Sequence, residues 1–460
     1  HFPLPTLPFP TVSSMSSIEL PSLNVVDEPI FFSDSSDDEE STSFLHKKSS
    51  PSSSSSSPPL PLSPSTPPRQ ADLSTLRQSY ANTFIAFIGA GILGLPYAFS
   101  QVGVMLGLII LCSVAVISTY TMLLLVTTKD KLVRDGLVDG GSVITYGVLG
   151  KVLLGERGKS FVDFCLVFSQ VGFSIAYLVF ICQNFNDMFG WSNGRVVFLA
   201  FPALCLLVML RSLKKLAPFS LIADVANLIG LATVYLVDFE YVPLQHHSIT
   251  QFDWSAFFFF VGVSVYCYEG FGLILPLENA MQDKKQFPRV LKNTITVVTG
   301  LYASFGIFGY LAFASDTNEI ITLNMPGSTV ATIVKFSLCI GLYLTYPIMI
   351  FPVVEILEKP IVSLITRDAS NVTVQNTFRI SIVVFTCFVS VSIPNFGLFI
   401  SFVGSSICAT LAFILPVLFY LKSHSGELDQ TTVLMNKGIM VFGILSAIIG
   451  TSQTFKEMMI

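Results

Sequence analysis

Apolar runs of about 20 residues recur along most of this 460-residue chain, and they constrain its fold more than any other feature. Each run is long enough to cross the hydrocarbon core of a membrane, about 30 Å thick, as one α-helix. The composition agrees, because 52% of the residues are hydrophobic and 12% are charged, against roughly 25% charged residues in soluble domains. The sequence therefore predicts an all-α polytopic membrane protein in contact with membrane lipids.

The loops between the apolar runs predict the orientation of the chain. Lys and Arg residues concentrate in alternate loops, whereas the opposite loops hold Arg195 alone, with Lys456 after the last run. Because basic loops favour the cytosolic side, we expect a cytosolic N-terminus, and the glycosylation sequon at Asn371 then falls on that side and stays unmodified. The eleven expected spans are about 77–101, 102–127, 160–184, 195–210, 216–237, 254–279, 290–314, 328–357, 377–394, 397–421 and 436–455.

Residues 1–76 differ in composition from the rest of the chain. They hold nine of the 30 acidic residues and three of the 25 basic residues, so this segment has a net charge of −6 and the remainder a net charge of +1. Its Ser/Pro-rich stretch, SSPSSSSSSPPLPLSPSTPP, has too few large apolar side chains to offset the entropy lost on ordering. We expect a disordered, acidic, cytosolic tail at 1–76, followed by one transmembrane domain at 77–460.

Two of the expected spans contain helix-breaking residues near their middle. The first carries FIGAGILGLPYAF at 87–99, and the sixth carries YEGFGLILPLEN at 268–279. Both show Gly-x-Gly, then aliphatic residues, then Leu-Pro. The loop charges give the two spans opposite directions, so the breaks occupy matching positions in two inverted halves, about 77–237 and 254–421, with an extra helix at about 436–455.

Interrupted helices at matching positions of inverted halves indicate a transporter binding site. The reason is that irregular backbone at membrane depth persists only where it is buried in protein or lines a watery cavity. The alternative is that the glycines form close helix-packing faces, as expected for Gly103 and Gly107. The repetition of the pattern favours the binding site.

These motifs also resemble a known family. GAGILGLPYAF, YEGFGLILPLENAM, YPIMIFPVVEILE at 346–358 and PNFGLFISFVGSSICATLAFILP at 394–416 resemble the amino acid/auxin permease family over roughly residues 77–455. Within it, the chain is most similar to plant vacuolar neutral amino acid transporters and to proton-coupled amino acid transporters of animals. The resemblance implies a LeuT-like 5+5 inverted repeat with an eleventh transmembrane helix, and secondary transport at a vacuolar membrane.

The substrate of such a carrier would present a carboxylate, an ammonium group and a side chain. We expect the carboxylate to bind main-chain N–H groups of the first break, and the ammonium group to bind carbonyls freed at both breaks. Aromatic residues would set side-chain selectivity, with ordinary packing as the alternative for each of them. The candidate substrate-binding residues are Ile88, Gly89, Ala90 and Gly91 at the first break, Tyr268, Gly270 and Phe271 at the second, and Tyr177 on the third span.

Ionisable residues inside the spans are candidates for ion coupling, since a charge in the bilayer usually persists for a function. Glu269 beside the second break is the leading candidate for a proton carrier, and Asp224 on the fifth span is the second. For Glu269 a purely structural role stays open. Sodium coupling is the rival: sodium-coupled relatives resemble this chain at Thr345, a candidate ion site, but they have asparagine where this chain has Ile85.

The main prediction is a proton-coupled secondary transporter of neutral amino acids that works by alternating access around the two breaks. The alternatives are a plasma-membrane carrier of aromatic amino acids or auxin-like acids, and an amino acid sensor that does not transport. An enzyme is disfavoured, because the sequence lacks an intramembrane histidine cluster, acids at metal-site spacing and a phosphate-binding loop. We expect no cofactor, no metal and no nucleic-acid partner.

Overall fold

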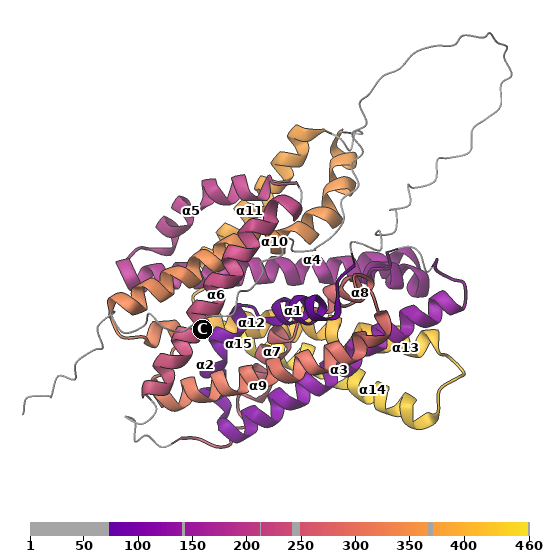
Figure 1. Cartoon of the computed structure of the whole chain (residues 1–460), viewed down its shortest axis with the longest axis horizontal. Helices are drawn as coiled ribbons and strands as arrows, with labels where there is room; N and C mark the ends of the chain where they lie inside the picture. The colour runs from indigo at the N-terminus through magenta and orange to yellow at the C-terminus, as the bar shows by residue number, and fades with distance from the viewer. Residues whose placement is uncertain (1–72, 140–142, 212, 242–248, 367–370, 459–460) are drawn as a thin grey trace, which may run out of the picture.

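The computed structural model describes residues 73–139, 143–211, 213–241, 249–366 and 371–458, and these fold into a bundle of helices (Figure 1). The expected tail lies outside the described residues, except for its last four positions. Within the described ranges, nine helices are long and apolar enough to cross a membrane, or ten when the bent first pair is taken as one span. The prediction of an all-helical, multi-pass membrane protein is confirmed. The count of eleven spans and the 5+5 repeat remain predictions.

The first half of the bundle begins with a capped helix. Thr75 Oγ1 accepts the N–H of Gln78, and the Gln78 side chain accepts the N–H of Thr75, which together form a capping box. Gly155 lies at a kink within the fourth helix. The elements are α1 Leu76–Phe87, the 3₁₀ turn η3 Ala90–Gly94, α2 Leu95–Val102, α3 Val104–Arg134, α4 Tyr146–Phe189, α5 Asn193–Val208 and α6 Leu213–Tyr241.

The second half contains another interrupted helix and three π-helical stretches, η8, η9 and η10. Its first span is divided at residues 268–270, and the span near the end passes through π-helix at η8 and η9. The elements are α7 Phe257–Cys267, α8 Phe271–Asn279, η5 Lys284–Gln286, α9 Phe287–Phe313, η6 Ala314–Asp316, η7 Ile321–Asn324, α10 Thr329–Thr366, α11 Val372–Ser392, α12 Phe396–Val403, η8 Gly404–Cys408, η9 Thr410–Ile414, α13 Leu415–Ser423, α14 Gln430–Leu445, η10 Ser446–Gly450 and α15 Thr451–Met458.

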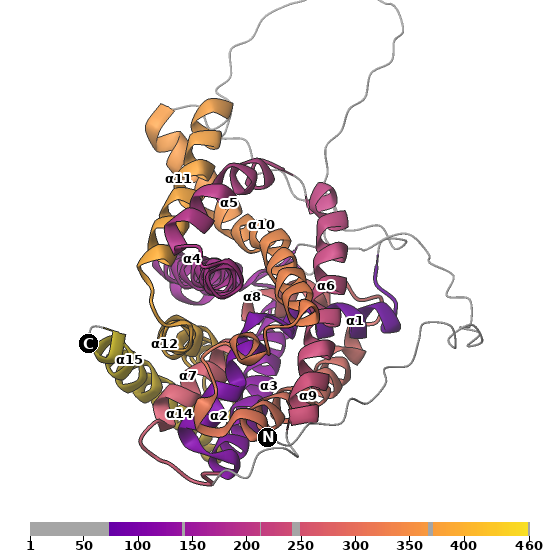
Figure 2. The same cartoon turned by 90° about the vertical axis from the view of Figure 1, so that its left-hand side faces the viewer.

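The two interrupted helices lie at the centre of the bundle. In Figure 2, α2 and α7 run between α12 on one side and α9 on the other, and each of these neighbouring pairs is in contact. The approach of η8 to α7 is especially close, because a Cβ added at Gly404 would lie 1.9 Å from the carbonyl oxygen of Gly262. A larger residue at Gly404 would therefore push the end of the α12 span away from the core.

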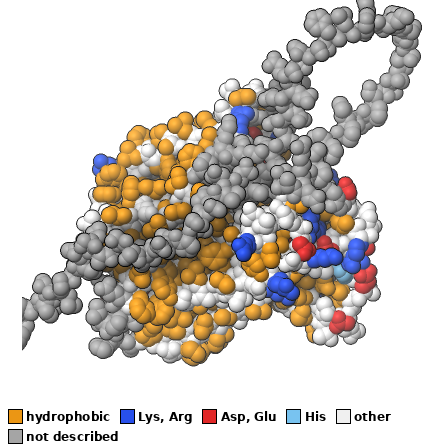
Figure 3. All heavy atoms as spheres, in the orientation of Figure 1, with side chains coloured by type: hydrophobic (Ala, Val, Ile, Leu, Met, Phe, Trp, Pro, Cys, Tyr) orange, Lys and Arg blue, Asp and Glu red, His pale blue; other side chains and the backbone are white. Residues whose placement is uncertain are grey.

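The outer surface of the bundle is apolar. Large hydrophobic side chains such as Phe198, Leu364 and Phe388 are more than two-thirds exposed, and Figure 3 shows a broad hydrophobic belt. Charged side chains gather at the right-hand end of that view. This distribution fits a protein whose sides face lipid and whose ends face water, because lipid tails give no reason to bury apolar residues inside.

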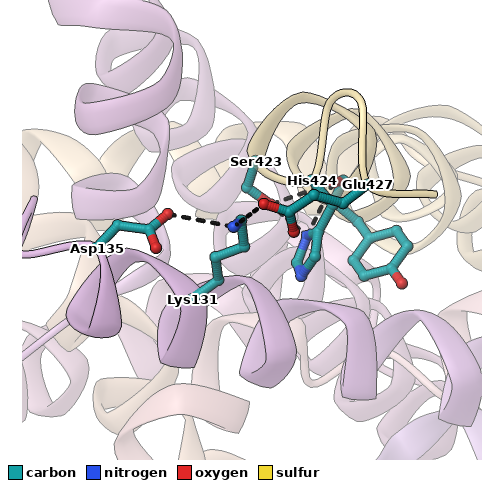
Figure 4. A network of polar contacts seen from close by, with 6 residues as sticks. Lys131, Asp135, Ser423, His424 and Glu427 are labelled. Atoms are coloured by element: carbon teal, nitrogen blue, oxygen red, sulfur yellow. Dashed lines mark hydrogen bonds and ion pairs between the residues drawn. The ribbon is translucent and has the colours of Figure 1, made fainter.

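The charged end of the bundle holds a network between α3 and the turn before α14 (Figure 4). Lys131 Nζ lies between two carboxylates, 2.6 Å from Glu427 Oε1 and 3.4 Å from Asp135 Oδ2. Both carboxylates are largely exposed to solvent. Because both carboxylates remain in contact with water, which weakens the charge attraction, this network orients the ends of the helices more than it stabilises the fold.

A second set of contacts at this end joins the start of α1 to the end of α8. The N–H of Ser74 donates to the carbonyl of Ala280 at 2.7 Å, and the N–H of Gln282 donates to the carbonyl of Ser74 at 3.2 Å. Lys129 Nζ lies 2.6 Å from Glu278 Oε1, and both of these side chains are buried. The start of α1 and the end of α8 are therefore held together at the charged end.

Candidate functional site

The first break interrupts the backbone between α1 and α2. The helix α1 ends at Phe87, Ile88 and Gly89 are extended, and the chain then turns through η3 into α2. The two helical parts meet at an angle of 46°. Because Gly89 has φ −130° and ψ −173°, a conformation open to any residue, the break does not require glycine at this position.

The second break separates α7 from α8. The helix α7 ends at Cys267, and α8 begins at Phe271 after Tyr268, Glu269 and Gly270. Gly270 packs directly on the first break, since a Cβ added there would lie 2.8 Å from the ring of Phe87. The sequence motifs therefore predicted two interruptions that the structure places against each other.

Tyr302 on α9 forms hydrogen bonds with both breaks. Its hydroxyl donates to the carbonyl of Phe87, the last residue of α1, and lies 3.3 Å from the carbonyl of Cys267, the last residue of α7. Both carbonyls are helix-end groups that lack a partner in the continuing helix. Sequence reasoning missed Tyr302, because nothing in its local sequence indicates that α9 reaches both interruptions.

The glycines of the first break differ in what surrounds them. A Cβ added at Gly91 would lie 2.8 Å from Cys267 Sγ and 3.0 Å from the ring of Tyr266, so this glycine is required by packing against α7. A Cβ at Gly89 would meet nothing closer than the Tyr177 hydroxyl, at 3.8 Å. Gly89 therefore has open space beside it, whereas Gly91 does not.

A small cavity opens beside the first break. Its volume of about 10 Å³ is enough for one water molecule at most. The break supplies one wall, α6 and α10 supply the others, and Asn227 is the polar side chain among the residues that line it. The lining residues are Ile88, Gly89, Ala90, Ile92, Leu93, Asn227, Leu231, Leu338 and Leu342.

Three of the predicted binding residues thus line the cavity, and those of the second break do not. Tyr268 is fully buried and donates its hydroxyl to Thr299 at 2.9 Å, so it faces α9. Phe271 is buried in the core. Tyr177 is also buried, with its hydroxyl near Gly89, and this places it next to the cavity wall.

Asn227 was absent from the sequence-based predictions. Its Oδ1 is buried and has no hydrogen-bond partner in the described part of the chain. The atom lies against Gly341 of α10, since a Cβ added there would be 2.2 Å away. An asparagine within an apolar span was the available signal, but the sequence did not tell which face of α6 meets the first break.

The two predicted coupling carboxylates lie in different places. Glu269 sits within the second break, and its Oε1 is buried without a hydrogen-bond partner among the described residues. Asp224 on α6 is partly buried and accepts a long hydrogen bond, 3.5 Å, from the hydroxyl of Ser220 one turn earlier. Lys335 on α10 is paired with Asp187 at 2.6 Å.

The Thr345 hydroxyl, the candidate ion ligand, makes a hydrogen bond within its own helix. The Thr345 hydroxyl donates to the carbonyl of Gly341 at 2.8 Å. Ile85, four residues before Gly89, contributes no side-chain oxygen. Among the described residues, no group of three or more His, Cys, Asp or Glu side chains is arranged to hold a metal ion.

This geometry defines a class: a multi-pass membrane protein whose centre is built from two interrupted helices in contact. The chain belongs to the transmembrane amino acid transporter protein family, whose match spans residues 72–456. The resemblance drawn from the sequence motifs is thereby confirmed.

Individual relatives agree with the family assignment. The chain is 36% identical to amino acid transporter AVT3B of Arabidopsis thaliana over 84% of this chain and 94% of that protein. It is 32% identical to amino acid transporter ANT1 of the same plant over 86% of this chain and 96% of that protein. Vacuolar amino acid transporter 3 of Saccharomyces cerevisiae is 31% identical over 81% of this chain and 55% of that protein. These relatives are transporters and not enzymes, as predicted.

The solved structures add little to the fold assignment. A substrate-bound, outward-open Na⁺-coupled sialic acid symporter aligns over 82% of this chain and 96% of its own, with a TM-score of 0.44 and 10% identity. Values this low leave the LeuT-like arrangement of the helices a prediction.

Proposed function

We propose that this protein is a secondary active transporter of neutral amino acids, coupled to protons, that works by alternating access around the two interrupted helices. The observation that carries the proposal is the contact between the breaks, where Tyr302 reaches the last carbonyls of both α1 and α7. Main-chain groups freed at such interruptions are the usual means by which transporters hold a zwitterion.

The first break is the proposed site for the substrate carboxylate. The N–H groups of Gly89, Ala90 and Gly91 lie outside the regular hydrogen bonding of α1, and the start of the following helical segment carries a partial positive charge. The carbonyl of Ile88 and those at 268–270 are the proposed partners of the ammonium group. Because the cavity beside Gly89 already touches this segment, it is the natural place for the binding pocket to widen when the carrier opens.

A neutral substrate side chain is supported by the cavity walls. Its lining is aliphatic apart from glycine, alanine and Asn227, and it contains no charged side chain. A cationic or anionic substrate would lose its hydration there without gaining an opposite charge, which costs several kcal/mol. Tyr177, whose hydroxyl lies near Gly89, is the proposed contact that separates small from large side chains.

Proton coupling is supported by the carboxylates and by a missing oxygen ligand at the rival sodium site. Glu269 has a buried oxygen without a partner, directly within the second break. Asp224 is the second candidate. Ile85 offers no side-chain oxygen where sodium-coupled relatives have asparagine, so a sodium site beside Thr345 would lose one of the several oxygen ligands that a hard cation requires.

The vacuolar membrane is the proposed location, with the N-terminus in the cytosol. The yeast relative supports the vacuolar location, since it is named a vacuolar amino acid transporter. A fluorescent fusion in intact cells distinguishes the vacuolar from the plasma membrane.

Uptake into proteoliposomes tests the function. Labelled alanine, proline and phenylalanine are each supplied with and without an imposed pH gradient. We expect accumulation above equilibrium for small neutral amino acids when the gradient is present, and its loss in Glu269→Gln. Binding without flux would instead identify a sensor, and preference for phenylalanine or auxin-like acids would identify the alternative carrier.

A further inference from the structure

Asp238, near the end of α6, is a buried carboxylate without a partner. Its side chain is 0% exposed, and among the described residues neither Oδ1 nor Oδ2 has a hydrogen-bond partner. It lies one residue beyond the expected fifth span, 216–237, so sequence reasoning treated it as part of a loop. The structure continues α6 to Tyr241 and so places Asp238 within the helix.

Three helices meet at this carboxylate. Gly309 of α9 packs against both neighbours, since a Cβ added there would lie 3.2 Å from Asp238 Oδ2 and 2.6 Å from Cγ of Pro96. Pro96 belongs to the first turn of α2, immediately after the first break. The helix α9 also packs along both α2 and α6. Asp238 is therefore at the junction of α2, the second half of the first span, with α6 and α9.

No described charged group faces Asp238 from these helices. α2 contains no Asp, Glu, Lys, Arg or His. The basic residues of α9, Arg289 and Lys292, lie at its other end, and Lys292 is 17 residues from Gly309, about 26 Å along a helix. The titratable group of α9 nearest in sequence to Gly309 is Tyr310, whose hydroxyl accepts the N–H of Thr250. On α10, which packs along α6, Lys335 is paired with Asp187.

An ionised carboxylate in these surroundings is costly, because it is shielded from solvent and has neither a hydrogen-bond donor nor a counter-charge among the described residues. The protonated acid carries no net charge and is far cheaper to bury. While the junction is closed, Asp238 is therefore stable when a proton has bound to one carboxylate oxygen. Loss of that proton requires water to enter between α2, α6 and α9.

We propose that Asp238 is a proton-binding residue of the transport cycle, which takes up a proton when the α2–α6–α9 junction opens to water and keeps it while the junction is closed. The proton is the ligand, and the step converts a hydrated carboxylate into a buried carboxylic acid with no other bond changed. This inference rests on the proposed proton-coupled transport and adds a coupling group distinct from Glu269 and Asp224. Protonation of Asp238 would then depend on the position of Pro96, which follows the first break.

The test compares Asp238→Asn with wild type in proteoliposomes. Two quantities are measured for each: alanine counterflow without a pH gradient, and alanine accumulation together with proton entry under a pH gradient. Asn imitates the neutral acid, so we expect counterflow to persist while gradient-driven accumulation and proton entry are lost. Asp316→Asn, which alters an exposed acid, is the matched control and should leave both quantities unchanged.

The outcomes separate this inference from the proposed function. If wild type shows no gradient-driven accumulation, proton coupling itself is wrong. If both wild type and Asp238→Asn show gradient-driven accumulation, Asp238 does not carry the coupled proton. If counterflow and accumulation fall together in Asp238→Asn, Asp238 has a structural role. Either result overturns the inference. Should Asp238→Asn fail to fold, Asp238→Leu replaces it, because an apolar side chain suits an apolar junction better than an unpaired polar one. The same loss of proton entry with counterflow retained is expected, and the same joint loss would refute the inference.

Discussion

Gly89→Ala provides the sharpest test of where the substrate binds. The backbone at Gly89 is extended, and an added Cβ finds no atom closer than 3.8 Å, so the folded protein can accept the methyl group without strain. Replacing glycine by alanine at a compatible position stabilises a protein by about 0.4–1 kcal/mol, because the unfolded chain loses conformational freedom. We therefore expect a melting temperature equal to or above that of wild type.

The same methyl group should weaken substrate binding. If the carboxylate approaches the N–H groups around Gly89, the methyl occupies space that the substrate needs, and overpacking of this kind costs about 1–3 kcal/mol. That energy corresponds to a roughly 5- to 150-fold increase in the apparent dissociation constant for alanine. The assay is the concentration dependence of alanine counterflow in proteoliposomes, with the melting temperature measured on the same preparation.

Two further glycines serve as controls. Gly91→Ala places a Cβ 2.8 Å from Cys267 Sγ, so this substitution should lower the free energy of unfolding by about 1–3 kcal/mol. A loss of transport in Gly91→Ala would therefore not identify a binding site by itself. Gly300→Ala, with no atom within 4 Å of the added Cβ, should leave transport unchanged. Unaltered apparent affinity in a stable Gly89→Ala protein would refute the placement of the substrate at the first break.

Three other predictions concern the ends of the bundle. Glu278→Gln should destabilise the protein by about 3 kcal/mol, near the lower limit for breaking a buried ion pair, because Asp130 remains 3.3 Å from Lys129. The double variant Lys129→Met/Glu278→Leu, which removes both charges, should be more stable than Glu278→Gln. Melting temperatures test this prediction, and equal values for the two variants would refute it. Burial raises the pKa of the Glu319 carboxyl, so its stabilising contribution is complete below its ordinary pKa and is lost as the pH rises through the raised value. Glu319→Gln should therefore reduce the fall in melting temperature between about pH 4 and pH 7, and an unchanged pH profile would show that another group is responsible. Asn371 should carry no glycan in cells, and a mass shift removed by a glycosidase would reverse the expected orientation.

The sequence predicted the parts of the fold that are local. The glycines of the two motifs mark the interruptions, because glycine disfavours regular helix. The prolines do not mark them, since Pro96 lies in the first turn of α2 and Pro276 lies within α8. The apolar runs likewise coincide with helices, although α5, with 16 residues, is shorter than a typical span. Asp238 was misplaced because hydropathy falls at a charged residue even when the helix continues past it.

The site was less predictable because it depends on which helix faces meet. A strongly apolar span shows no polar face, so the sequence does not reveal that Asn227 turns toward the first break or that Tyr302 reaches both breaks. The same limit applies to the second break. Tyr268 was a natural candidate for substrate contact, but its hydroxyl is held by Thr299 on α9. These contacts join residues that are far apart in the chain, and no local pattern encodes them.

A density map of the purified protein with bound alanine would test the central claim most directly. The account predicts the carboxylate within hydrogen-bonding distance, about 3 Å, of the N–H groups of Gly89 to Gly91, with the ammonium group facing the carbonyls at 268–270. Alanine bound elsewhere in the bundle, with both interrupted segments turned away from it, would contradict the account.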